Sequence, residues 1–291
     1  MARYLVAALA LAAAIALPLA TKPRRLVAVL AAAASDSTAA PTAEAAGSTV
    51  AATERSSPGA SRPTKRPVRR SAAASSSSGH LTTPADASDT PAYRYARLSQ
   101  TECEAELAAR HIDYTQETAI AVAEPVRLAG PLHGVLFRTD QTARTRRTSP
   151  YEIADCRLVL ALDDFAEILN RHDIVEVRHY SMYRPPTTWS DDKPATRHPG
   201  ALAIDAGRFI DRAGAVLDVD RDFHGAIDAK TCGEGAAPRP ATPSALALRA
   251  ILCETVDRRL FNVVLTPNYN KPHHNHFHLE LTAGVSWFLV H

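Results

Sequence analysis

A histidine-rich segment near the C-terminal end constrains the fold of this 291-residue chain more than any other feature. It holds four histidines within six positions: His273, His274, His276 and His278. His276 and His278 alternate with Phe277 at the two-residue period of a β-strand, so both imidazoles should leave the same face of a sheet. The segment is therefore predicted to be a strand that presents two histidines to one site.

A second pair of metal-binding residue types lies upstream of this segment. His198 and Asp205 are seven positions apart, and a turn at Pro199-Gly200 leads into the strand-like run 201–204. That arrangement can bring an imidazole nitrogen and a carboxylate oxygen to one ion. Two histidines and one aspartate would leave a tetrahedral Zn²⁺ with an open position, as in catalytic rather than structural zinc sites. The alternatives are a solvated histidine-rich turn and a loop that buffers metal without catalysis.

The first 34 residues have the pattern of an export signal. Residues 4–20 form an apolar run after Arg3, typical of a secretory signal. A second apolar run over residues 26–34 is too short to span a bilayer by itself. We therefore predict a signal peptide or an uncleaved signal anchor over residues 1–34, the latter a membrane tether. The mature protein should be extracytoplasmic: periplasmic, associated with the cell wall, or secreted.

Residues 35–97 are predicted to be a disordered linker, because they are rich in Ala, Ser, Thr and Pro and have no apolar periodicity. Residues 1–80 carry ten Lys or Arg and three Asp or Glu, so this part is strongly basic although the whole chain is only +2. The basic cluster 65–70 could contact anionic lipid or an acidic wall polymer, or it could simply keep a tail soluble. We find no motif for nucleic-acid binding.

The four cysteines, at positions 103, 156, 232 and 253, favour disulfides over metal ligation. Their number is even, their spacing is wide, and the chain carries an export signal. Three pairings are open. We expect Cys103–Cys156 and Cys232–Cys253, because each of these pairs would bracket one end of the domain.

Residues 98–291 are predicted to form one monomeric α+β domain, a small and mostly antiparallel sheet flanked by helices. The expected helices span residues 102–110, 158–170 and 244–258, with another helix start at Ser149-Pro150. The expected strands are two within 119–136, then 174–180, 202–209, 216–219, 261–265 and 276–281.

Three motifs together resemble a known family. They are Tyr180-Ser181-x-Tyr183-Arg184, His198-x6-Asp205 and His273-x2-His276-x-His278. This combination resembles the C-terminal domain of bacterial extensin-like proteins, itself similar to zinc D-alanyl-D-alanine carboxypeptidases and murein endopeptidases. The resemblance covers about residues 98–285 and implies a small antiparallel sheet flanked by helices.

The resemblance also implies a role for each residue. His198, Asp205 and His278 would bind zinc, and His273 and His276 would lie beside it, either to support the ligands or to transfer protons. Two positions depart from the family pattern: Ala201 stands where Gly is common, and Thr196 where Ser is usual.

Arg184 matches the arginine that in these peptidases holds the substrate carboxylate or the developing oxyanion. Its guanidinium offers a permanently charged fork suited to either group. The alternative is an ordinary surface arginine before a Pro-Pro turn.

The leading functional hypothesis is an exported zinc-dependent hydrolase that cleaves an amide bond in peptidoglycan peptide. Zinc makes water nucleophilic near neutral pH, and a neutral histidine can take its proton. The alternatives are a zinc-stabilised, catalytically inactive wall-binding module and a purely structural domain without metal.

Overall fold

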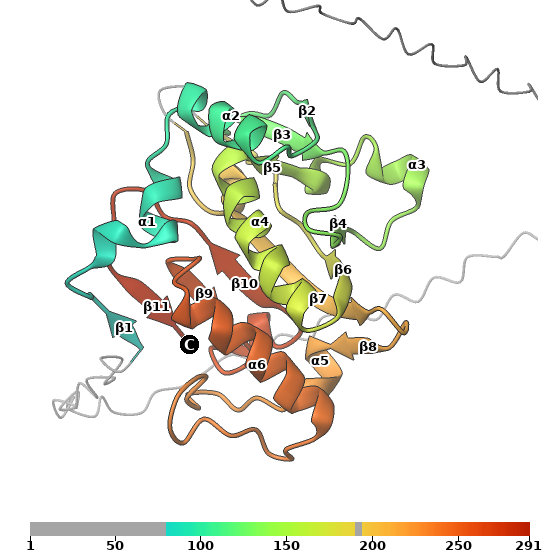
Figure 1. The fold of residues 1–291 in the computed structure, drawn as a ribbon, viewed down its shortest axis with the longest axis vertical. Helices are drawn as coiled ribbons and strands as arrows, with labels where there is room; N and C mark the ends of the chain where they lie inside the picture. The colour runs from blue at the N-terminus through green and yellow to red at the C-terminus, as the bar shows by residue number, and fades with distance from the viewer. Residues whose placement is uncertain (1–79, 190–193) are drawn as a thin grey trace, which may run out of the picture. The chain divides into compact units, whose positions relative to one another are not determined.

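The computed structural model describes residues 80–189 and 194–291 (Figure 1). The predicted signal segment 1–34 and the linker up to residue 79 lie outside the described residues. Within the described part, no helix is both long and apolar enough to cross a lipid bilayer.

The helices are α1 (Pro91–Ala96), α2 (Gln100–Ala109), α3 (Ala143–Arg146), α4 (Cys156–Arg171), α5 (Val219–Asp222) and α6 (Pro243–Asp257). Short 3-10 turns are η2 (Ala87–Asp89), η3 (Pro150–Glu152), η4 (His198–Gly200) and η5 (Lys271–His273). The strands are β1 (Leu81–Thr82), β2 (Tyr114–Gln116), β3 (Pro125–Leu128), β4 (Leu136–Arg138), β5 (Ile153–Asp155), β6 (Ile174–His179), β7 (Ala203–Asp211), β8 (Val216–Asp218), β9 (Val263–Leu265), β10 (Phe277–Glu280) and β11 (Phe288–Val290).

Two sheets organise the described residues. The larger has the order β1-β11-β9-β10-β7-β6-β4, with β8 paired to β7, and the smaller has the order β2-β3-β5. Among the strands of residues 80–189 and 194–291, only the β4–β6 and β9–β11 pairs are parallel. Figure 1 shows helices α4 and α6 in front of the strands of the larger sheet. The predicted α+β class, with a mostly antiparallel sheet flanked by helices, is confirmed.

Helix α4 forms the centre of the core. Asp155 caps its first turn by accepting a hydrogen bond from the Arg157 backbone N–H at 3.0 Å. Phe165 on this helix contacts the rings of Phe209 and Phe261, at centroid distances of 6.4 and 6.1 Å. Burying one such ring stabilises the fold by roughly 1.5–3 kcal/mol, so α4 fixes the sheet from one side.

Several predicted boundaries differ from the structure. The helix start expected at Ser149-Pro150 is only the turn η3, because β5 follows at once and α4 begins after its own cap at Asp155. Of the two strands expected within 119–136, β3 is present. The second, β4, starts only at Leu136, because a tight turn closed by the Leu132–Val135 bridge precedes it.

The folded unit begins earlier than the predicted boundary at residue 98. Residues 81–97, expected in the linker, contain β1 and α1, and β1 pairs with β11 at the other end of the chain. Tyr95 of α1 is buried and donates a hydrogen bond to Asp164 Oδ2 of α4 at 2.6 Å. The apolar face of this short helix holds the segment on the core.

Both predicted disulfides are confirmed. Cys103–Cys156 joins α2 to the start of α4, and Cys232–Cys253 ties the segment before α6 to that helix. Their sequence separations of 53 and 21 residues correspond to about 3–4 kcal/mol each in the chain-entropy model. Two disulfides favour an extracytoplasmic location, because thiols stay reduced in the cytosol.

His179 at the end of β6 makes stability depend on pH. It is fully buried, neither ring nitrogen has a hydrogen-bond partner within the described residues, and burial lowers its pKa to about 4. The folded state therefore binds fewer protons than the unfolded state between pH 4 and about 6.5. The contribution of neutral His179 to the free energy of unfolding is complete above that window and is lost as the pH falls through it.

We expect the wild type to lose about 2–3 kcal/mol more unfolding free energy than His179→Leu between pH 7 and pH 4.5. Urea denaturation of both proteins at the two pH values, with a chelator present throughout, measures this difference. Equal losses in the two proteins would contradict the assignment.

Candidate metal centre

The register between two central strands brings the first two predicted ligands together. In the antiparallel β7–β10 pair, His278 lies directly opposite Asp205, and side chains at such positions are close neighbours. His278 Nδ1 is 3.0 Å from Asp205 Oδ1, and the aspartate is only 1% exposed. The carboxylate is therefore held in the interior of the sheet.

The third predicted ligand comes from the turn that precedes β7. Gly200 is required in this turn, because a Cβ there would lie 2.0 Å from the Ala195 carbonyl oxygen. The turn places His198 Nε2 3.1 Å from Asp205 Oδ1 and 3.2 Å from His278 Nδ1. The three donor atoms lie within 4.8 Å of one another, so this buried group could hold a metal ion.

Outer hydrogen bonds fix which ring nitrogens face the centre. His198 Nδ1 lies 2.9 Å from the Met182 carbonyl oxygen, and His278 Nε2 lies 3.0 Å from Glu280 Oε2. Both partners only accept, so these outer nitrogens carry the protons and the inner nitrogens of the neutral rings present lone pairs. Two such lone pairs beside a carboxylate oxygen repel one another unless a cation lies between them.

The charges of the centre agree with that geometry. Burial alone would raise the pKa of Asp205, but the imidazoles of His198, His276 and His278, whose inner nitrogens donate to it when they carry a proton instead of facing a cation, hold it well below its ordinary range. Burial lowers the pKa of His278, and the hydrogen bonds to Asp205 and Glu280 outweigh it, so the net shift is upward. The site thus favours a positive charge. Its nitrogen-rich donor set suits a transition metal such as zinc better than Ca²⁺ or Mg²⁺, which prefer oxygen.

Arg184 holds the other side of the buried carboxylate. Its Nη2 donates to Asp205 Oδ2 and its Nε donates to Ser181 Oγ at 2.8 Å. The two carboxylate oxygens are thereby divided, Oδ1 toward the histidines and Oδ2 toward the arginine. The Arg184 side chain is 52% exposed, so part of its guanidinium still faces the cleft.

The two remaining histidines approach from different directions, as their spacing predicts. His276 shares the face of His278, and its Nε2 lies 3.3 Å from Asp205 Oδ1. His273 enters from η5, with ring centroids 5.2 Å from His276 and 5.8 Å from His278. Burial, helped by the neighbouring imidazoles, lowers the pKa of His273 to about 4, which keeps it neutral at pH 7.

The Asn270 side chain determines the tautomer of His273. Asn270 Oδ1 accepts the His273 backbone N–H at 3.3 Å and lies 2.6 Å from His273 Nδ1. Because this oxygen is an acceptor, Nδ1 carries the ring proton and Nε2 is left as the basic nitrogen. His276 lies between two acceptors, with Asn275 Oδ1 2.8 Å from its Nδ1 and Asp205 Oδ1 3.3 Å from its Nε2.

All six predicted site residues line one cleft of about 870 Å³, together with Tyr269 and Trp287.

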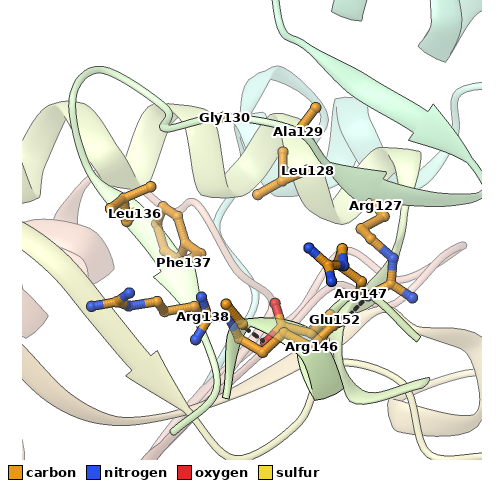
Figure 2. A pocket seen from close by; sticks show the side chains of 11 residues that line it. Arg127, Leu128, Ala129, Gly130, Leu136, Phe137, Arg138, Arg146, Arg147 and Glu152 are labelled. Carbon is orange, nitrogen blue, oxygen red and sulfur yellow. Dashed lines mark hydrogen bonds and ion pairs between the residues drawn. The ribbon is translucent and has the colours of Figure 1, made fainter. Parts of the chain in front are cut away.

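A second concavity of about 370 Å³ lies beside β3, β4 and α3 (Figure 2). Figure 2 shows arginines along one part of its lining and apolar side chains, including Phe137, along another. Arg127 there donates to Glu117 and Arg138 donates to Glu176, both at 2.5 Å, so protein partners already use much of this charge. The histidine-lined cleft is the better candidate site.

The turn that carries His198 is strained at both ends. Arg197 has φ 56° and ψ −145°, and Ala201 has φ 52° and ψ 28°. Glycine adopts these conformations freely, whereas other residues there cost about 1–3 kcal/mol each. Ala201 therefore holds a left-handed conformation that glycine would adopt without strain.

The fold and the site define an α+β protein with a His₂Asp centre at the base of an open cleft. A family model described as extensin-like protein C-terminus matches residues 98–288, well over half of the chain. The chain belongs to this family. No curated protein and no solved structure matched this chain.

Some residues of the centre were not predicted from the sequence. Glu280 orients His278 and lies two positions after it, so the two-residue period that relates His276 to His278 could have found it. The Met182 carbonyl and the strained backbone of Arg197 leave no comparable signal in the sequence.

We expect the protein to bind one zinc ion, and His198→Ala, Asp205→Ala and His278→Ala to lose it. Glu280→Gln should weaken zinc affinity by about 10- to 100-fold, because it loosens the orientation of His278. His274→Ala is the matched control, since this histidine is exposed and bonds to the Lys271 carbonyl instead. Elemental analysis and competition with a chelator measure both effects. Stoichiometric zinc in the three alanine variants would refute the ligand assignment.

Proposed function

We propose that the protein is an exported zinc-dependent hydrolase that cleaves an amide bond in peptidoglycan peptide. One observation carries this proposal: three buried donor atoms, within 4.8 Å of one another, belong to residues that line an open cleft of about 870 Å³. Structural zinc sites are usually closed by four protein ligands, whereas catalytic sites keep a position open. A three-donor centre that faces a cleft matches the second kind.

Zinc held by His198, Asp205 and His278 would act as a Lewis acid and make water nucleophilic near neutral pH. His273 is the proposed proton acceptor. Its Nε2 is the basic nitrogen because Asn270 binds the proton on Nδ1. A neutral, partly buried imidazole at the cleft can take a proton from the attacking water and return it to the leaving amine.

His276 and Arg184 would act as donors. His276 Nε2 lies 3.3 Å from Asp205 Oδ1, and the ring lines the same cleft. Arg184 uses Nε and Nη2 within the protein, and its remaining Nη1 can donate to the oxygen that becomes negative during attack. The pairing with Asp205 keeps the guanidinium in place for this task.

The proposed substrate class follows from the compartment and the cleft. Disulfides favour an extracytoplasmic protein, where wall peptide is the abundant amide polymer. Arg184 and Arg197 line the cleft and offer positive charge to peptide carboxylates. The similarity of the motifs to those of zinc D-alanyl-D-alanine peptidases supports the same class.

His273→Ala should keep its zinc and lose about 10²- to 10⁴-fold in turnover, the usual contribution of a positioned acid or base. The assay incubates zinc-loaded protein with isolated peptidoglycan and quantifies newly released amines. His274→Ala again serves as the control and should retain full turnover.

The same assay separates catalysis from binding. Wild-type protein that carries zinc and binds peptidoglycan but releases no amine would contradict the enzyme proposal. That outcome would instead identify a zinc-stabilised wall-binding module.

A further inference from the structure

Arg197, directly before the predicted ligand His198, holds a backbone conformation that suits glycine rather than arginine. Its carbonyl oxygen accepts hydrogen bonds from the backbone N–H groups of Gly200 and Leu202, at 3.1 and 2.9 Å. A glycine could make both of these bonds without strain. The backbone role therefore does not account for an arginine at this position.

The contacts of the side chain do not account for it either. The guanidinium is 73% exposed, and its nearest charged partner is Glu280 Oε2, 3.7 Å from Nε. That separation exceeds direct hydrogen-bond length, and an exposed ion pair stabilises a fold only slightly. Within the described residues the planar fork remains available to an external ligand.

The fork lies beside the centre and approaches the partner of His278, whereas Arg184 approaches Asp205. Glu280 Oε2, which Arg197 approaches, is bonded to the outer nitrogen of His278 at 3.0 Å. Arg184 is bonded to the outer oxygen of Asp205. Both arginines line the same cleft, so a peptide that crosses the centre can meet both guanidinium groups.

We propose that Arg197 is a specificity-determining residue that binds a free carboxylate of the substrate. Glu280 Oε2 lies between the guanidinium and His278, 3.7 Å from Arg197 Nε and 3.0 Å from His278 Nε2. An extended peptide advances about 3.5 Å per residue. The carboxylate it binds then lies within about two residues of the scissile amide. The preferred substrate is an anionic wall peptide, and amidation of that carboxylate weakens binding. This inference rests on the proposed function, because it assumes that a peptide crosses the centre.

The test measures binding rather than turnover. Two synthetic stem tetrapeptides, identical except that one has free carboxylates and the other has them amidated, are titrated calorimetrically into the zinc-loaded full-length chain. The His273→Ala background prevents hydrolysis during the titration. We expect the free acid to bind about tenfold or more tightly than the amide, as for a charge-assisted Arg–carboxylate contact.

Arg197→Ala should reduce the ratio of the two affinities roughly tenfold. Arg197→Lys, which keeps the charge but not the planar fork, should retain part of the preference for the free acid. Arg144→Ala is the control for net charge, because Arg144 is exposed on α3 and does not line the cleft; it should leave the preference unchanged. Arg197→Gly should lose the preference and also gain about 2–4 °C in thermal midpoint through relief of strain. Zinc content and thermal midpoint of each variant establish that the fold and the centre are intact.

Equal binding of the two peptides, no binding of either, or an unchanged preference in Arg197→Ala would overturn the inference. Its failure differs from failure of the proposed function. A protein that hydrolyses both peptides equally well is an enzyme in which Arg197 does not select. A protein that prefers the free acid through Arg197 and never releases an amine is a binding module with this specificity.

Discussion

The register of β10 against β7 is the constraint on which the candidate centre depends. Phe277 and Leu279 are fully buried, and Phe277 packs on Phe209, which in turn contacts Phe165 of α4. Side chains alternate between faces, so burial of these residues beneath α4 directs His278 to the other face, opposite Asp205. A slip of one residue would place the histidine in the core. The hydrophobic pattern therefore positions a polar site.

The buried carboxylate of Asp205 interacts with every other member of the candidate centre that is named below. Asp205 is surrounded by three imidazoles and a guanidinium, and each outer partner fixes the orientation of an inner group. Loss of one member leaves a desolvated charge without compensation, which is strongly destabilising. The strained turn around His198 follows the same logic, because Gly200 and the tight approach to Ala195 hold the histidine in place at the expense of relaxed backbone at Arg197. The strained backbone at Arg197 lowers the stability of the fold at a place where the site needs a fixed geometry.

Local patterns in the sequence predicted much of this arrangement. The two-residue period placed His276 and His278 on one face, helical spacing located α4, and the Pro199-Gly200 pair located the turn. Long-range pairing was beyond such patterns: β1 has two residues, and its partner β11 lies at the other end of the chain. The choice of ring nitrogen at His198 and the tautomer of His273 depend on a carbonyl and an amide supplied by other segments. Periodicity cannot report contacts of that kind.

The central claim is that His198 Nε2, Asp205 Oδ1 and His278 Nδ1 form one metal centre. Anomalous X-ray diffraction from crystals of the zinc-loaded protein tests it most directly. The account predicts one dominant anomalous peak between these three atoms, at about 2.0–2.2 Å from each. A principal zinc peak at another histidine pair, such as the stacked His80 and His291, or none between the three donors, would contradict it.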